Sequence, residues 1–191
     1  MPRKIILASK SPFRKKMLEE LGIEFEVVVS NADETPDESL SFGEQLKAIS
    51  LKKAKAVFEK TISQGKRIIV AADQNIVFGG KMYGKPGTIQ EARDLIKSMR
   101  GSDEIYAYVG NTIVEADGNE VIQIISNFET ARMSMDNVSD EVIEDYLIND
   151  TPLQRCGGIH VDNVEFLHLL EGKLSTARGM TTEHLLKILE S

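Results

Sequence analysis

The sequence predicts one α/β domain spanning residues 1–191, and three observations lead to this class. Through the first half of the chain, strand-like apolar runs alternate with longer helical runs, a pattern typical of α/β proteins. The run RIIVAAD is apolar enough for a strand that is buried on both faces of a sheet. The length of 191 residues suffices for one substantial core and is short for two independent domains.

The first elements follow from local signals along the chain. Three strands and two helices are expected, in the order strand, helix, strand, helix, strand, over residues 5–8, 12–21, 25–29, 42–62 and 67–73. Gly22 is a C-terminal stop for the first helix, because glycine adopts the left-handed conformation that ends helices. The second strand leads into the acidic loop NADETPDES, and the third is expected to end at Asp73.

The second half mixes hairpins with shorter helices. A hairpin is expected in IVFGGKMYG, because the pair Gly79-Gly80 suits its turn, and long antiparallel strands are expected around Asp117-Gly118-Asn119. The remaining elements are helices at 89–99 and 140–149, the loop RCGGIHVDN, a further strand pair and a C-terminal helix from Thr182.

Composition excludes several classes of protein. A net charge of −7 argues against a dedicated nucleic-acid binder, which is usually basic. The single cysteine, Cys156, forms no internal disulfide and leaves no cysteine-based metal site. No apolar run approaches a membrane span, and the run at residues 5–8 is far too short for a signal-peptide core. We therefore expect a cytoplasmic protein with no nucleic-acid or membrane partner.

Two cations stand on helix faces that should be apolar. Arg14 shares a face with Met17, Leu18 and Leu21, and Lys53 falls within the stripe of Leu46, Ile49, Ser50 and Val57. Cations in the first turns of a helix also oppose its dipole unless an anion lies nearby. Each cation alone fits a snorkelling side chain or a structural ion pair. Together they indicate an anion pocket equally well.

Carboxylates at strand ends are the natural complement to these cations. Asp73 follows a buried strand, and the carboxyl ends of strands are where open α/β sheets bind ligands. Asp33 and Glu34 lie in the loop after the second strand. Such carboxylates hold Mg²⁺ through oxygen ligands, and lysine and arginine clamp phosphate oxygens. The simpler alternatives are a turn-capping Asp73 and an ordinary acidic loop.

Other candidate features are weaker. Lys85 follows Tyr83-Gly84 at the end of the hairpin, where a solvent-exposed lysine is equally expected. The three histidines have no ligand-like spacing and are expected to be structural or exposed. Neither the Walker motif nor the Rossmann glycine motif occurs, so neither kind of nucleotide site is indicated.

Taken in order, these stretches resemble the Maf family of nucleoside triphosphate pyrophosphatases over nearly the whole chain. The stretches that carry the resemblance are LASKSPFRKKMLEELG, ADETP, LKKAKA, VAADQ, YGKP, YVG and PLQRCGG. The resemblance implies a Maf/ITPase-like α/β fold with a long mixed sheet, flanking helices and a cleft between two lobes, often as a homodimer. It also implies hydrolysis of the bond between the α- and β-phosphates, which yields a nucleoside monophosphate and pyrophosphate.

The resemblance also implies roles for particular residues. Asp73 would accept a proton from the attacking water, and Glu34 would join Asp73 in placing a divalent metal, Mg²⁺ or Mn²⁺. The residues that would contact the triphosphate are Ser9, Arg14, Lys53 and Lys85.

For the nucleobase, the resemblance is greatest to the branch that hydrolyses 7-methyl-GTP. This branch has an aromatic residue, a Gln and an acid where this chain has Phe13, Gln74 and Asp162. An aromatic ring can stack on the cationic purine, and a carboxylate can pair with it. Apart from the resemblance, Phe13 is expected to be a core residue. Arg178 departs from the pattern, since the family has a small apolar residue there.

Three alternative functions remain. The chain could hydrolyse dTTP and UTP, as another branch of the family does, although that branch has Thr after the catalytic Asp. It could be a non-catalytic nucleotide-binding regulator of cell division, which the presence of Asp73 disfavours. A phosphotransferase is the third, and no stretch of the sequence suggests an acceptor site.

Overall fold

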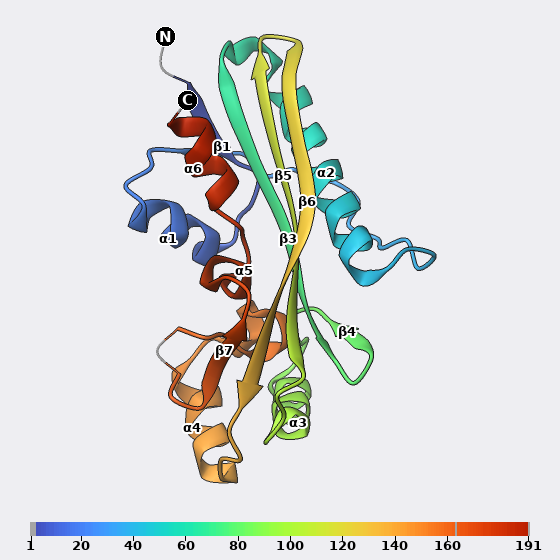
Figure 1. The fold of residues 1–191 in the computed structure, drawn as a ribbon, viewed down its shortest axis with the longest axis vertical. Helices are drawn as coiled ribbons and strands as arrows, with labels where there is room; N and C mark the ends of the chain where they lie inside the picture. Colours follow the sequence, from blue (N-terminus) through green and yellow to red (C-terminus); the bar gives the residue numbers. More distant parts are fainter. Residues whose placement is uncertain (1–2, 163, 191) are drawn as a thin grey trace. The chain divides into compact units, whose positions relative to one another are not determined.

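A computed structural model describes residues 3–162 and 164–190 (Figure 1). Contacts between residues divide the chain into two compact units. The first unit comprises residues 1–73, 109–129 and 179–191, and the second comprises residues 74–108 and 130–178. Because each unit draws on separate stretches of the chain, neither is a continuous segment. The expectation of one domain over residues 1–191 stays a prediction.

The sheet is mixed, as expected, and has seven strands in the order β2-β1-β3-β5-β6-β7, with β4 pairing to β3. The strands are β1 Lys4–Leu7, β2 Glu26–Val27, β3 Arg67–Phe78, β4 Lys81–Tyr83, β5 Ile105–Asp117, β6 Glu120–Met135 and β7 Leu167–Glu171. β1 runs parallel to β2 and β3, whereas β4 and β7 pair antiparallel to β3 and β6. The prediction of an α/β fold with a long mixed sheet and flanking helices is confirmed.

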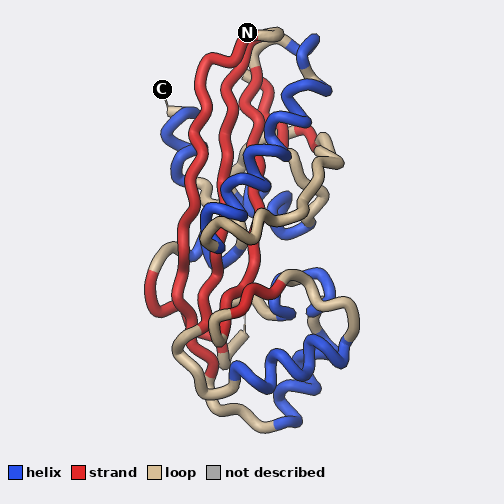
Figure 2. Tube along the Cα trace, turned by 90° about the vertical axis from the view of Figure 1, so that its right-hand side faces the viewer, coloured by secondary structure: helices blue, strands red, loops and turns tan. Residues whose placement is uncertain are grey.

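The first unit contains the helices α1 Pro12–Glu20, α2 Phe42–Lys60 and α6 Glu183–Leu189. Alternate residues of a strand point to opposite faces, so β1 sends Ile5 and Leu7 into one cluster and Ile6 into another. The cluster around Leu7 includes side chains of α1 and α6, and the cluster around Ile6 includes side chains of α2. Helices therefore cover both faces of this part of the sheet, and α2 is the long helix that crosses the strands in Figure 2.

α2 lies unusually close to β5 because of one glycine. A Cβ atom placed on Gly110 would lie 2.2 Å from the backbone carbon and oxygen of Leu46 in α2. Beside this approach, the buried hydroxyl of Ser50 contacts the hydroxyl of Thr112 at 2.8 Å, and Thr112 contacts Ser126 at 2.9 Å. These contacts join α2, β5 and β6 and set the depth at which α2 packs.

The second unit has its own hydrophobic core. Its helices are α3 Ile89–Met99, α4 Asp140–Asn149 and the short α5 Leu174–Arg178. α3 begins after Thr88, whose hydroxyl accepts a hydrogen bond from the backbone N–H of Glu91. This N-cap fixes the start of the helix where the sequence predicts it.

Four predicted boundaries differ from the structure. β3 continues through Asp73 to Phe78, because pairing with β4 and β5 sustains the strand where Gln74 and Asn75 interrupt the apolar run. α2 ends at Lys60, before a short 3-10 turn at residues 62–64, and β2 is limited to Glu26–Val27.

The expected strand pair near the C-terminus is wrong. Only β7 forms there among the described residues, and it pairs with β6, the strand already predicted, instead of with a second new strand. The chain then enters α5, which the sequence did not indicate. Separately, no helix in the described ranges combines the length and apolarity needed to span a bilayer.

Candidate active site

A buried lysine joins two carboxylates in the first unit. The Nζ atom of Lys53 donates to Oδ1 of Asp73 at 2.5 Å and forms an ion pair with Oε2 of Glu34 at 2.8 Å. The lysine side chain is 8% exposed, Asp73 is 16% exposed and Glu34 is 56% exposed. The three residues, here called the Lys53 cluster, therefore run from a buried ammonium to a carboxylate open to solvent.

Each member of the Lys53 cluster is placed by a different element. Lys53 stands on the buried stripe of α2, beside Ser50. Asp73 lies on β3 just beyond Val70, the last residue that pairs with β1. β1 and β3 are parallel, so Asp73 lies past the carboxyl end of β1, in the position that suits a ligand. The predicted location at a strand end thus holds for the neighbouring strand β1 and not for β3.

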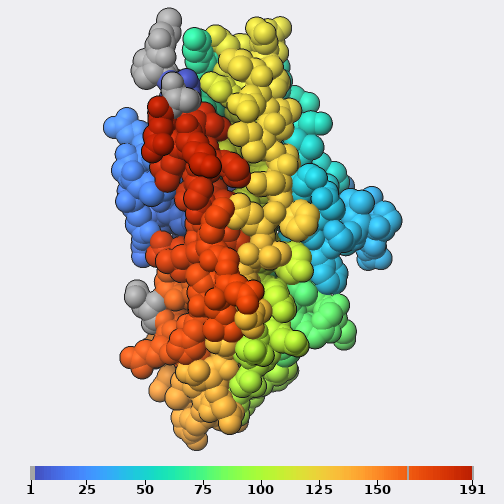
Figure 3. All heavy atoms as spheres, in the orientation of Figure 1, coloured from blue at the N-terminus to red at the C-terminus, as the bar shows by residue number. Residues whose placement is uncertain are grey.

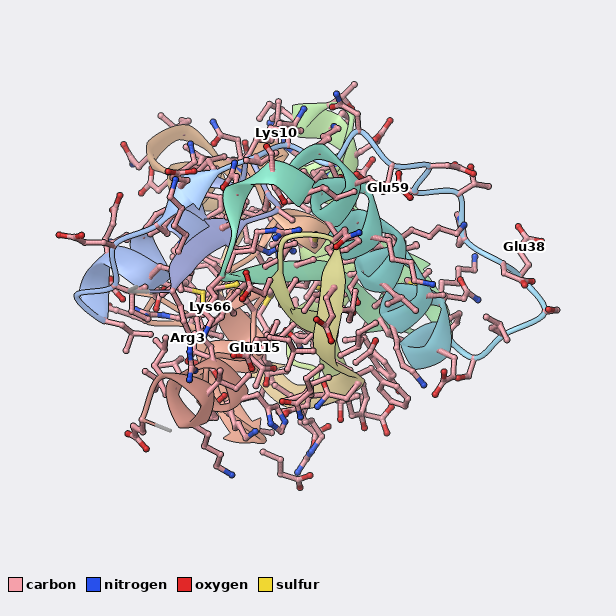
Figure 4. All side chains as sticks on the ribbon, turned by 90° about the horizontal axis from the view of Figure 1, so that it is seen from above. Arg3, Lys10, Glu38, Glu59, Lys66 and Glu115 are labelled. Atoms are coloured by element: carbon pink, nitrogen blue, oxygen red, sulfur yellow. The ribbon has the colours of Figure 1, made fainter. Side chains whose placement is uncertain are left out.

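Glu34 comes from the exposed loop between β2 and α2. This loop extends outward to Glu38, which Figure 4 shows pointing away from α2. Asp33 and Asp37 use their carboxylates within the loop, accepting hydrogen bonds from the backbone of Thr35 and Ser39. These hydrogen bonds lower the pKa of both carboxyl groups. Within the acidic loop, Glu34 is thus the residue whose carboxylate reaches Lys53.

Ser9 and Arg14 form a second group of contacts in the first unit. The hydroxyl of Ser9 accepts hydrogen bonds from Nη1 of Arg14 and from the backbone N–H of Ser11, both at 3.2 Å. Nε of Arg14 donates to the carbonyl of Gly179 at 3.0 Å. In the described part of the chain, no carboxylate lies within ion-pair distance of Arg14, so its positive charge is available to an anion.

The remaining predicted residues are held differently. Gln74 donates from its side-chain amide to the carbonyl of Ala177 at 3.0 Å. Asp162 accepts from Nε of Arg178 at 2.7 Å, and Lys85 is exposed in the loop after β4. All three belong to the second unit, whereas Phe13, half-buried on α1, belongs to the first. The structure therefore brings together Glu34, Lys53 and Asp73, and separately Ser9 and Arg14.

Arg178 is the residue that the sequence reasoning missed as a partner of the predicted site. Its signal was present, because an arginine replaces a small apolar residue in the resembling motif. The carboxylate of Asp162, predicted to meet a cationic base, is instead paired with this guanidinium.

The RCGGIHVDN loop is described except for Asn163, and it holds a structural histidine. Nε2 of His160 lies 2.5 Å from Oδ2 of Asp150, and its Nδ1 accepts from the backbone N–H of Asp162. Burial lowers the pKa of His160 more than the hydrogen bond to Asp150 raises it, so the imidazole is neutral with its proton on Nε2. No cluster of three His, Cys, Asp or Glu side chains suited to a metal occurs among the described residues.

The Lys53 cluster nevertheless suits Mg²⁺ or Mn²⁺ bound together with a polyphosphate. Magnesium sites of this kind use one or two protein carboxylates and fill the other positions with phosphate oxygens and water. Glu34 and Asp73 are two carboxylates that converge on one point, and the exposure of Glu34 leaves them open to a ligand. A metal bound to them would lower the pKa of a coordinated water.

Comparisons with known proteins agree with the resemblance. The family model described as "Maf-like protein" matches residues 4–191. A protein named dTTP/UTP pyrophosphatase from Caldicellulosiruptor bescii is 33% identical, over 81% of this chain and 76% of its own length. A protein of the same name from Desulforamulus reducens is 29% identical over 96% of this chain and 93% of its own.

A solved structure shares the fold at low sequence identity. The Staphylococcus aureus Ham1 protein aligns over 98% of both chains with a TM-score of 0.50 and 11% identity. The match of the family model covers all but three residues of the 191, and the motifs that carry it include the residues of the Lys53 cluster. The chain belongs to the Maf-like protein family.

Proposed function

We propose that this chain is a nucleoside triphosphate pyrophosphatase that hydrolyses the bond between the α- and β-phosphates. The observation that carries the proposal is the Lys53 cluster, in which a partly buried Asp73 lies beyond the end of β1. Relatives of this chain named dTTP/UTP pyrophosphatase support the same reaction class.

In this proposal Asp73 is the general base. Its Oδ2 atom accepts a proton from a water molecule while the water oxygen bonds to phosphorus. The anhydride bond to the bridging oxygen breaks, and pyrophosphate leaves with the electron pair of that bond. Lys53 keeps the carboxylate of Asp73 ionised and oriented through its hydrogen bond to Oδ1.

Cations neutralise the triphosphate in the same scheme. Arg14 binds phosphate oxygens at the start of α1, where Ser9 orients its guanidinium. This binding explains the cations in the first turns of that helix, because a bound polyphosphate reverses their unfavourable interaction with the dipole. Lys53 and the exposed Lys85 are further phosphate ligands in this proposal, and Glu34 and Asp73 hold the metal.

We assign dTTP and UTP as the preferred substrates, which are those in the names of the relatives. The ion pair between Asp162 and Arg178 supports this assignment. A carboxylate already paired with a guanidinium attracts the cationic base of 7-methyl-GTP less than a free one does. The second candidate is 7-methyl-GTP, which Gln74 and the half-buried ring of Phe13 favour.

A substrate panel tests the proposal. Pyrophosphate release is measured from dTTP, UTP, CTP, GTP and 7-methyl-GTP with Mg²⁺ or Mn²⁺. We expect the highest kcat/KM for dTTP and UTP. A preference for 7-methyl-GTP would keep the reaction and overturn the substrate assignment. A folded, metal-loaded protein that binds nucleotides and turns none over would be a binding regulator.

The variant Arg178→Ala tests the role of the ion pair. Removing the guanidinium frees the charge of Asp162, so we expect kcat/KM for 7-methyl-GTP to rise about tenfold relative to dTTP. Arg178→Lys is the matched control, because it keeps a positive charge beside Asp162 and should keep the ratio near that of the wild type. An unchanged ratio in Arg178→Ala would show that Asp162 does not contact the base.

A further inference from the structure

The outer edge of β6 is open along the first unit. β6 pairs with β5 on one side, and its other neighbour, β7, is in register only with Arg132–Met135. Over residues 120–130 the outer backbone edge therefore meets no strand in the described part of the chain. Unpaired N–H and C=O groups along such an edge are a template for another strand.

This edge lacks the features that protect edge strands. Val121 is 41% exposed, Ile122 is 55% exposed and Ile124 is 45% exposed. Figure 3 shows this part of β6, in yellow, on the surface that faces the viewer. Residues 120–130 include no Lys, Arg or Pro, which are the residues that usually block strand addition. An edge this apolar and unprotected is suited to being covered.

We propose that a second copy of this chain covers it, by antiparallel pairing of β6 with β6 about a two-fold axis at Gln123. The run Val-Ile-Gln-Ile-Ile, residues 121–125, is nearly symmetric about its centre. In this register Ile122 lies opposite Ile124 of the second copy, and Val121 lies opposite Ile125. Antiparallel partners on one face pack side by side, so four isoleucines gather at the axis.

Charge also favours a second copy over another partner. Residues 121–128 carry no charged side chain, so nothing in the edge attracts an oppositely charged peptide. The proposed register sets Glu120 opposite Ser126 and keeps it away from Glu129, so like charges do not face each other. A two-fold interface uses the same patch on both subunits, which the symmetric sequence satisfies.

The mass of the purified full-length chain in solution is the first test. Sedimentation should give twice the monomer mass of 21.2 kDa. The double variant Ile122→Lys/Ile124→Lys sets like charges against each other, and we expect the dissociation constant to rise at least about 100-fold. Ile148→Lys is the matched control, because Ile148 is 76% exposed on α4, and it should leave the dimer intact. A wild type that stays monomeric at every concentration would overturn the proposal.

Crosslinking tests the register without relying on the lysine variants. In a Cys156→Ser background, Gln123→Cys sets two cysteines directly opposite each other, about 4.5 to 5.5 Å apart between Cα atoms, within disulfide reach. Mild oxidation should give a covalent dimer. Glu120→Cys is the control, because its two cysteines would lie roughly 20 Å apart. Equal crosslinking at both positions, or none at Gln123→Cys in a dimeric protein, would overturn the proposed pairing.

Discussion

Replacing Asp73 by Asn is expected to lower kcat for pyrophosphate release by about 1,000-fold. Asparagine keeps the size of the side chain and can accept the hydrogen bond from Lys53, so the packing of α2 on β3 should persist. It cannot accept a proton from water at neutral pH. The loss should therefore fall mainly on kcat, with a smaller change in KM.

Asp33→Asn is the control for this result. Asp33 is an exposed acid next to Glu34, and its carboxylate accepts a hydrogen bond from the backbone of Thr35 within the loop. Its variant should turn over within about twofold of the wild type, since its charge lies outside the Lys53 cluster. If Asp73→Asn kept more than about a tenth of the wild-type kcat, another group would have to accept the proton.

Gly110→Ala is expected to reduce the free energy of unfolding by about 3 kcal/mol. The new Cβ would meet the backbone of Leu46 at 2.2 Å and the backbone nitrogen of Lys47 at 2.4 Å. A backbone cannot rotate aside as a side chain can, so α2 must move away from β5. Urea denaturation followed by circular dichroism measures the loss. Because α2 also carries Lys53, turnover by the folded fraction should fall with it.

Gly84→Ala is the matched control for the close approach. A Cβ on Gly84 would lie 3.4 Å from the side-chain oxygen of Asn75, which is an ordinary contact. This variant should change the free energy of unfolding by less than about 0.5 kcal/mol. Similar losses at the two positions would mean that the effect of Gly110 comes from backbone entropy and not from packing against α2.

Local signals in the sequence were enough for several helices. α3 and α4 have the predicted bounds, 89–99 and 140–149, and α1 begins at the predicted Pro12. A helix start is a local event, set by a cap and the next few residues, so sequence alone can place it. The Gly79-Gly80 hairpin was predictable for the same reason, since both glycines adopt positive φ.

Long-range pairing decided the elements that were predicted wrongly. β3 continues past Asp73 because β4 pairs with Ile76, Val77 and Phe78, and nothing in residues 67–73 signals this pairing. β7 finds its partner in β6, more than thirty residues earlier, as in the pairing of Met135 with Leu167. Such choices depend on which strand edges remain open once the sheet has formed.

The same division applies to the candidate site. The sequence by itself determined that Lys53 stands on the apolar stripe of α2, because helical periodicity requires it. Only the tertiary structure decided that its partners are Asp73, 20 residues later, and Glu34, and that Asp162 is paired with Arg178. An ion pair forms between side chains that the fold brings within a few ångströms, and periodicity along the chain carries no information about that distance.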